Sequence, residues 1–252
     1  MEVLLITQAR LGSSRFPNKI LKEINSKSLL EIHLNRLKKS KRVSNFLVAS
    51  TFEDGIDSVK RISELNGFAF FQGSTKNVLD RFYQSSKKYD SDYIVRVTSD
   101  CPLIDAELID QVINFTINNN LDYGSNILEE TFPDGQDIEV FKKEVLNQTW
   151  EQAKSFHELE HVTPFIRNNS TYLGQNKFTS DNFLSSENYN NIRMTVDERE
   201  DLNAIETLVN TLGENKSWKE YTDYIKENYN LFSNQNILRN EGYFKSLNNE
   251  IE

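Results

Sequence analysis

The stretch EVLLITQARLGSSRFPNK, residues 2–19, runs from an apolar segment directly into a loop that carries glycine and cations. The letters VLLIT are typical of a buried β-strand. Gly12 lies between Arg10, Arg15 and Lys19, and a glycine lets backbone N–H groups approach an anion without a side chain in the way. Because ligands of open α/β sheets bind beyond the carboxyl ends of the strands, this loop is a candidate phosphate site. The spacing fits neither a Walker loop nor a GxGxxG fingerprint, so an ordinary loop with exposed cations stays open from composition alone.

Strand and helix patterns alternate through the first half of the chain. The strand patterns are EVLLIT, NFLVAST, FAFFQG and DYIVRVTSD, and the helix patterns cover residues 26–41, 56–67, 77–89 and 105–120. This alternation predicts an α/β fold with a mostly parallel sheet and helices on both faces. Short apolar strands such as FLVAS fit burial on both sides of the sheet.

The regular alternation of strand and helix patterns ends after a short strand pattern at residues 121–126. FPDGQDIEVFKK (132–143) indicates a turn and a strand, and VLNQTWEQAK and ELEHVTPFIRN indicate helices. NIRMTVDEREDLNAIETLVNTLG (191–213) returns to strand, loop and helix. We therefore expect one α/β domain over residues 1–215, with a small inserted subdomain at about 130–180. A helical extension and a polar tail follow over residues 216–252.

Charge and cysteine content narrow the class of protein. The 252 residues carry a net charge of −9, yet residues 1–42 hold ten Lys or Arg and only three Asp or Glu. That balance argues against general nucleic-acid binding and fits a local site for a small anion. No apolar run approaches the roughly 18 residues of a membrane span, so we expect no membrane partner. The single cysteine, Cys101, excludes an internal disulfide, and we expect a reducing cytoplasm.

Two aspartates follow apolar strand patterns. In VRVTSDCPLID (95–105), Asp100 falls just past the strand, while Asp105 is better placed to cap the next helix. In RMTVDERED (193–201), Asp197 lies between a short strand pattern and a helix, where a role as helix N-cap stays open. Mg²⁺ takes one or two carboxylates together with phosphate oxygens. Two strand-end aspartates and a cationic loop therefore point to metal-assisted chemistry on a nucleotide.

A second polar group lies among apolar residues in PDGQDIEVF and FHELEHVTPF. Its members are Asp137, Glu139, Glu160 and His161. His161 suits a base or a ligand contact, and a structural histidine is equally compatible with the pattern. His33 lies on a helix with an apolar face, and we interpret it as structural.

The opening QARLGSSRFPNKIL resembles that of the cytidylyltransferases, the family that includes CMP-Kdo synthetase and acylneuraminate cytidylyltransferase. The usual form there is close to ARxGSxRLPxKxL, and the resemblance is closest to the spore-coat polysaccharide SpsF-like branch. Further similar segments follow in the family's order, namely GSTKNVLDRFYQ (73–84), VRVTSDCPLID, FPDGQDIEVF, ELEHVTPFI, RMTVDEREDL and ILRNEGYFKSL (237–247). Phe16, Asn18 and Ser99 replace the usual Leu, Gly and Gly, and we interpret these departures as tolerated.

The resemblance implies a Rossmann-like nucleotidyltransferase fold, CTP and Mg²⁺ as ligands, and a homodimer built through the inserted subdomain. It implies transfer of CMP to a sugar or sugar-acid acceptor with release of pyrophosphate, or transfer to a sugar phosphate or phosphonate. Asp100 and Asp197 would bind Mg²⁺, and Arg10 and Lys19 would complete the catalytic group. The nucleotide would contact Gln8, Ala9, Arg10, Leu11, Gly12, Arg15, Lys19, Ser74, Arg81, Thr98 and Asp100. The acceptor would contact Asp137, Glu139, Glu160, His161 and Arg193.

Two other classes of protein remain as alternatives. A glycosyltransferase would bind a finished nucleotide sugar through a metal at a DxD-like site, but TSDCP contains no DxD. A binding module without activity would be indicated by the loss of a metal aspartate or of Lys19, and all three residues are present. Pyrophosphate release distinguishes a nucleotidyltransferase from both.

Overall fold

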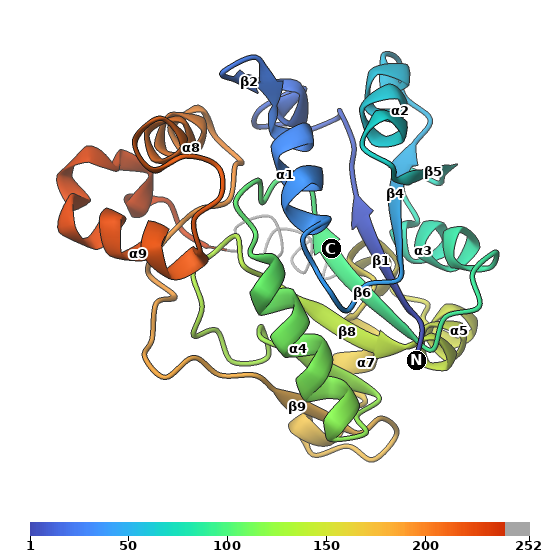
Figure 1. Ribbon diagram of the computed structural model, residues 1–252. Coiled ribbons are helices and arrows are strands. Elements are labelled where there is room, and N and C mark those ends of the chain that lie inside the picture. The colour runs from blue at the N-terminus through green and yellow to red at the C-terminus, as the bar shows by residue number, and fades with distance from the viewer. Residues whose placement is uncertain (240–252) are drawn as a thin grey trace.

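A seven-stranded sheet forms the centre of the computed structural model, which describes residues 1–239 (Figure 1). Its strands are β1 (Val3–Gln8), β4 (Asn45–Thr51), β5 (Ala69–Gly73), β6 (Tyr93–Thr98), β7 (Tyr123–Ser125), β8 (Glu139–Lys142) and β9 (Ser180–Asn182). A two-stranded hairpin, β2 (Glu23–Ile24) and β3 (Lys27–Ser28), lies apart from the sheet. The helices are α1 (Leu29–Leu37), α2 (Ile56–Leu65), α3 (Val78–Ser86), α4 (Ala106–Asn118), α5 (Lys143–Gln152), α6 (Phe156–His161), α7 (Pro164–Asn168), α8 (Arg199–Leu212) and α9 (Trp218–Glu227).

The order of the strands places a cleft at one edge of the sheet. That order is β5-β4-β1-β6-β8-β7-β9, and β8 alone runs antiparallel to its neighbours. From β1 the chain passes outward through β4 and β5, and then returns to the other side of β1 as β6. At such a reversal the loops after the two neighbouring strands diverge and leave a crevice. The predicted mostly parallel α/β architecture is confirmed.

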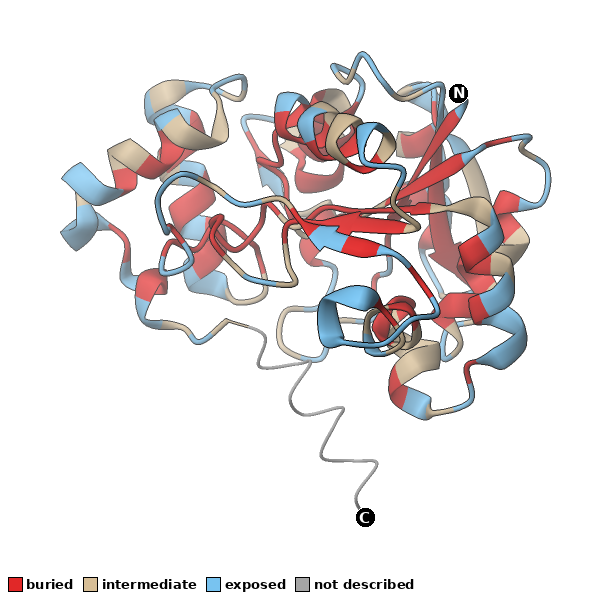
Figure 2. Ribbon diagram, turned by 90° about the horizontal axis from the view of Figure 1, so that it is seen from below, coloured by how far each residue is buried: buried red, intermediate tan, exposed pale blue. Residues whose placement is uncertain are grey.

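Both faces of the sheet are covered because successive strand residues point to opposite sides. Val3 and Leu5 of β1 pack in a core with side chains of α1, α2 and α4. Leu4 and Ile6 pack in a second core with side chains of α3 and α5. In Figure 2 most strand residues are accordingly buried, whereas the helices beside them are partly exposed. The continuous apolar runs of the sequence thus match burial on two sides.

Two local expectations differ from the structure. The helix expected over residues 26–41 begins at Leu29, because the hairpin takes up the preceding residues with Asn25 and Ser26 at positive φ. Ser28 still caps this helix by accepting from the Glu31 N–H. The segment NIRMTV is not a strand of the sheet, since its backbone bonds go to the loops at Asp134 and Asp100.

The C-terminal extension packs against the main domain. Tyr221, Ile225 and Phe232 share a third core with α1 and α8, and Figure 1 shows α8 and α9 together at one side of the sheet. Arg36 of α1 donates to the carbonyl oxygens of Glu214 and Lys216 at 2.6 and 3.0 Å. The expected inserted segment likewise contributes β8 to the main sheet. Of the family-like stretch at 237–247 and the expected tail, residues 240–252 lie outside the described part.

Candidate active site

A central cleft of about 590 Å³ lies where β1 and β6 end. Its walls come from the loop after β1, the end of β6, the loop before β8, α6 with α7, and the segment before α8. Most of the residues expected from the sequence line it, namely Gln8, Ala9, Arg10, Arg15, Lys19, Arg81, Thr98, Asp100, Asp137, Glu139, Glu160, His161, Arg193 and Asp197. Leu11, Gly12 and Ser74 are not among its lining residues. The fold therefore brings the two expected groups of polar residues into one cleft.

Lys19 joins the two strand-end aspartates. Its ammonium donates to Asp100 Oδ2 at 2.9 Å and to Asp197 Oδ1 at 2.7 Å. Burial alone would lower the pKa of this lysine, but the two carboxylates outweigh it and the pKa is raised. Burial opposes ionisation of Asp100, yet Lys19 and the Thr98 hydroxyl hold the pKa of Asp100 well below its usual range. Both groups are therefore charged at neutral pH.

Asp197 stands on a buried ion-pair network formed by Arg193 and Asp201. Arg193 donates from Nε and Nη2 to the two oxygens of Asp201 at 2.8 and 2.9 Å, and from Nη1 to Asp134 at 2.7 Å. Asp201 in turn accepts from the N–H groups of Asp197 and Glu198, both at 2.9 Å. This network closes one open alternative, since Asp197 precedes the N-cap of α8, which is Glu198. Arg193 lines the cleft while its guanidinium pairs with carboxylates of its own chain, and its contact with an acceptor stays a prediction.

The opening loop is held from behind by Glu53. The carboxylate of Glu53 accepts from the N–H of Leu11 at 2.8 Å and from the N–H of Gly12 at 3.4 Å. A methyl group added at Gly12 would lie 2.7 Å from Glu53 Oε1. The absence of a side chain at Gly12 therefore admits an internal carboxylate, whereas the sequence had suggested an approaching phosphate. No sequence pattern marks Glu53, which reaches this loop only because β4 and β1 are neighbours.

Cations gather on the side of the cleft near α3. Arg10 is exposed, whereas Arg81 is buried and donates to the carbonyl oxygen of Ser74 at 2.6 Å. Burial and, to a smaller extent, the nearby charge of Arg10 lower the pKa of Arg81 to about 10. The side-chain oxygen of Ser74 accepts from the N–H of Asn77 at 2.9 Å, and a contact between Ser74 and a nucleotide stays a prediction.

Arg96 is a lining residue that the sequence reasoning missed. It lies opposite Glu139 in the β6–β8 pairing, and the two side chains form an ion pair. Glu139 is buried and also accepts from the hydroxyls of Tyr123 and Thr163, at 2.7 and 2.6 Å. Its carboxylate therefore accepts from three protein side chains, and a direct contact between Glu139 and an acceptor stays a prediction. In the sequence, the position of the charged Arg96 between the apolar residues of VRV (95–97) is the one feature that could have marked it as a lining residue.

The remaining expected acceptor residues line the cleft together. Burial, Arg96 and His157 lower the pKa of His161 to about 3, so its imidazole is neutral at pH 7 and a weak base. Glu160 lies beside it, with its Oε2 3.8 Å from His161 Nε2. Asp137 pairs with Arg239 at 2.6 Å, and burial raises its pKa in spite of that arginine. This end of the cleft therefore offers a neutral ring and carboxylates for hydrogen bonding to a polyhydroxylated molecule.

The donor set at Lys19 fits a hard divalent cation. Within residues 1–239, no group of three or more His, Cys, Asp or Glu side chains could enclose a metal ion. Asp100 and Asp197 nevertheless face one position that already attracts an ammonium group. Because Mg²⁺ is usually held by one or two carboxylates, water and substrate phosphates, this pair suits a metal that arrives with its substrate.

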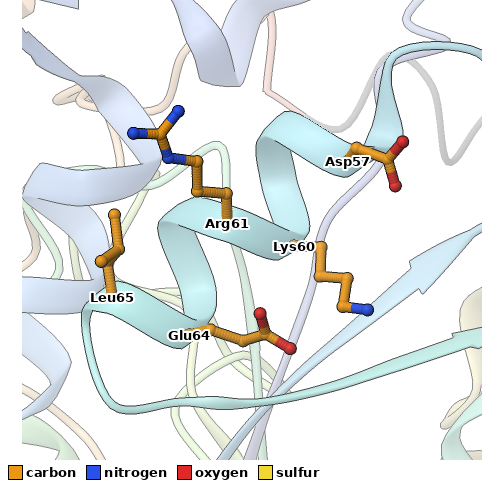
Figure 3. A pocket seen from close by; sticks show the side chains of 5 residues that line it. All are labelled: Asp57, Lys60, Arg61, Glu64 and Leu65. Carbon is orange, nitrogen blue, oxygen red and sulfur yellow. The ribbon is translucent and has the colours of Figure 1, made fainter.

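A second hollow, of about 320 Å³, lies on the surface of α2 and is lined by Asp57, Lys60, Arg61, Glu64 and Leu65 (Figure 3). Its lining comes from one helix, and its charged side chains point away from the axis of that helix toward its surroundings. It brings no side chains from separate elements together, so we assign the chemistry to the central cleft. No helix within residues 1–239 has the length and apolar content to cross a bilayer.

Comparison with known proteins identifies the family. A family model described as "Cytidylyltransferase" matches residues 4–242. The uncharacterised protein MJ1063 of Methanocaldococcus jannaschii is 39% identical over 203 residues, 80% of each chain. The spore coat polysaccharide biosynthesis protein SpsF of Bacillus subtilis is 32% identical over 219 residues, 84% of this chain and 88% of that one. A solved cytidylyltransferase structure from Leptospira borgpetersenii, at 31% identity, covers 95% of this chain and 100% of that one with a TM-score of 0.87. The chain belongs to the cytidylyltransferase family of enzymes.

Proposed function

We propose that the protein transfers CMP from CTP to a sugar or sugar-acid acceptor and releases pyrophosphate, in the synthesis of a surface polysaccharide or glycoconjugate. The observation that carries this proposal is the meeting of Lys19, Asp100 and Asp197 in one cleft that Arg10, Arg15 and Arg81 also line. Cations for a triphosphate and a carboxylate pair for a hard metal then lie within a single site. Membership of the cytidylyltransferase family supports CTP as the donor.

The proposed reaction is an in-line displacement at the α-phosphorus. A bond forms from the acceptor oxygen to the α-phosphorus as the bond to the bridging oxygen of pyrophosphate breaks, and the proton of the acceptor hydroxyl passes to water. Arg10, Arg81 and Lys19 bind the phosphates and stabilise the charge that develops on the leaving pyrophosphate. Asp100 and Asp197 hold Mg²⁺, which supplies positive charge at the α-phosphate when bound. No protein nucleophile is needed.

The acceptor binds at the end of the cleft formed by α6, α7 and β8. Asp137, Glu160 and His161 offer hydrogen-bonding groups there, and Arg96 and Arg167 bring positive charge. The name of SpsF supports a polysaccharide pathway. A sugar phosphate or phosphonate, giving a CDP-linked product, is the second candidate acceptor. A homodimer formed through residues of about 130–180 and a cytoplasmic location remain predictions.

The test is pyrophosphate release in the presence of Mg²⁺. Four nucleoside triphosphates are crossed with Kdo, sialic-type and legionaminic-type acids, several sugar phosphates and a phosphonate. We expect release with CTP and one class of acceptor only. If CTP raises the melting temperature but no pair releases pyrophosphate, the acceptor class is wrong. If CTP neither binds nor reacts, the proposed function is wrong. A glycosyltransferase would consume a nucleotide sugar without releasing pyrophosphate.

A further inference from the structure

The opening loop places its own cations on the carboxylate oxygens that a metal would use. Lys19 takes Asp100 Oδ2 and Asp197 Oδ1, at 2.9 and 2.7 Å. Arg15 takes the other oxygen of Asp197, Oδ2, at 2.8 Å. Lys19 is 8% exposed, so its ammonium is held in place between the two carboxylates. We call Lys19 and Arg15 together the cation latch.

A divalent ion cannot simply join this arrangement. Three of the four carboxylate oxygens of Asp100 and Asp197 already accept from ammonium or guanidinium groups, and the charge of a divalent ion would repel both cations at short range. The metal therefore has to displace Lys19 from the carboxylates. The ammonium group of Lys19 would then be largely buried without a counter-charge. Such a desolvated, unpaired charge is strongly unfavourable.

A triphosphate removes this obstacle. Arg15 and Lys19 line the same cleft as Arg10 and Arg81, where the phosphates of the proposed substrate bind. A triphosphate carries more negative charge than the two carboxylates and forms charge-assisted hydrogen bonds with lysine and arginine. Once the latch cations turn to the phosphates, the oxygens of Asp100 and Asp197 become available, and phosphate oxygens complete the metal's ligands.

We propose that the cation latch makes metal binding conditional on the nucleotide, so that Lys19 and Arg15 keep Asp100 and Asp197 closed to divalent ions until a triphosphate arrives. This inference rests on the proposed function, because it takes the ligand of the cleft to be a nucleoside triphosphate. Coupling between two ligands is reciprocal. Mg²⁺ must therefore tighten CTP binding by the same factor as CTP tightens Mg²⁺ binding.

The test measures binding of Mn²⁺ alone to the full chain, from the loss of the electron paramagnetic resonance signal of free Mn²⁺. We expect weak binding by the natural sequence and at least tenfold tighter binding by Lys19→Met, with a smaller gain for Arg15→Gln. Lys22→Met is the matched control, since Lys22 lies over the ring of Phe16 and does not line the cleft. It should bind Mn²⁺ as the natural sequence does. Equal Mn²⁺ affinity in the natural sequence and both latch variants would overturn the inference.

A second measurement needs no variant and covers the case in which Lys19→Met fails to fold. Thermal unfolding of the natural sequence is followed with Mg²⁺ alone, with CTP and a chelator, and with both ligands. We expect no change in melting temperature with Mg²⁺ alone and a larger rise with both ligands than with CTP alone. A rise with Mg²⁺ alone, equal to its effect in the presence of CTP, contradicts the latch. No response to CTP under any condition contradicts the proposed function instead.

Discussion

Single residues in the cleft are tuned by partners that lie far away in the sequence. Lys19 is separated from Asp100 and Asp197 by 81 and 178 positions, yet one nitrogen contacts both carboxylates. Arg193 likewise donates to Asp201 and Asp134, which lie 8 and 59 positions away in the sequence. In each case the residue type alone indicated that the side chain is charged. The fold decided which oppositely charged side chain it contacts.

Replacing Asp100 by Asn is expected to lower turnover at least about 100-fold, because the neutral amide supplies neither a metal ligand nor a counter-charge for Lys19. Circular dichroism should show an intact fold. The control is Asp57→Asn, because Asp57 is an exposed residue of α2 that does not line the central cleft. That variant should keep its turnover, and near-normal turnover of the Asp100 variant would remove Asp100 from the metal site.

Replacing Gly12 by Ala is expected to destabilise the opening loop by about 1 kcal/mol and to raise the KM for CTP. The new methyl group would lie 2.7 Å from Glu53 Oε1 and push this carboxylate away from the Leu11 and Gly12 amides. Urea unfolding and steady-state kinetics measure the two effects. In a Glu53→Ala background the same substitution should have little further effect, because the clashing atom is gone. Additive effects would mean that Glu53 does not anchor the loop.

The elements of the cleft are joined by polar groups buried between them. The ion pair of Arg96 and Glu139 ties β6 to β8, and Thr163 ties the start of α7 to the same carboxylate. His33 joins α1 to β1 and to the loop after β6. Its Nδ1–H donates to the Cys101 carbonyl oxygen and its Nε2 lies at Thr7 Oγ1, both at 2.9 Å. The expectation that His33 is structural is therefore confirmed.

Replacing Glu139 by Gln is expected to lower the free energy of unfolding by about 3 kcal/mol. The change leaves the Arg96 guanidinium partly buried without a counter-charge, and breaking one side of a buried ion pair is costly. Urea unfolding measures the loss. A double variant with Arg96→Met and Glu139→Met should lose less than the sum of the single variants. A loss below about 1 kcal/mol for Glu139→Gln would show that the pair does not hold the strands together.

The His33 imidazole is expected to make stability depend on pH. Burial lowers its pKa to about 4, with Arg36 adding to the effect and Asp100 opposing it, whereas an unfolded histidine titrates near 6.5. Its contribution is therefore complete above about pH 6.5 and is lost as the pH falls through 4. Between pH 7 and pH 5 the free energy of unfolding should fall by about 2 kcal/mol from this residue. Urea unfolding of the natural sequence and of His33→Gln isolates that contribution, and parallel pH profiles would contradict it.

At the scale of the whole molecule, the C-terminal extension takes part in holding the cleft. Gln235 accepts from the Arg193 N–H at 2.8 Å, and Asn234 donates to Asp201 at 3.1 Å. The extension therefore reaches the network beneath Asp197. Its helix α9 also bonds to the α4 cap, through the Trp218 N–H and Asp105 at 2.8 Å. Residues after 215 thus contribute to the same core and the same site as the first part of the chain.

Replacing Phe232 by Ala is expected to lower the free energy of unfolding by about 3 kcal/mol, because this ring is 2% exposed in the core shared with α8 and α9. The neighbouring Leu231 is 62% exposed and serves as the control. Its replacement by Ala should change stability by less than about 0.5 kcal/mol. Urea unfolding of both variants tests whether the extension is part of the cooperative unit. Equal small effects would make it a separate appendage.

The sequence by itself determined the α/β alternation, the loop after β1 and the two aspartates at the ends of extended segments. These follow from short-range rules, since side-chain periodicity, helix caps and the position of charged residues after apolar runs are local properties. The ordered series of family-like segments indicated the family through its resemblance to known sequences. The continuous apolar run of β1 likewise matches a strand that is buried on both faces.

Only the tertiary structure decided which partners the charged groups have. Glu53 reaches the Leu11 amide because β4 lies beside β1, and Glu139 meets Arg96 because β8 is inserted antiparallel beside β6. A side chain in the sequence carries the same charge whether it ends in an ion pair or faces a ligand. Burial makes unpaired charges costly, so the fold must pair them, and strand order chooses the partners. For that reason Glu139 pairs with Arg96, Arg193 pairs with Asp134 and Asp201, and Lys19 lies between Asp100 and Asp197.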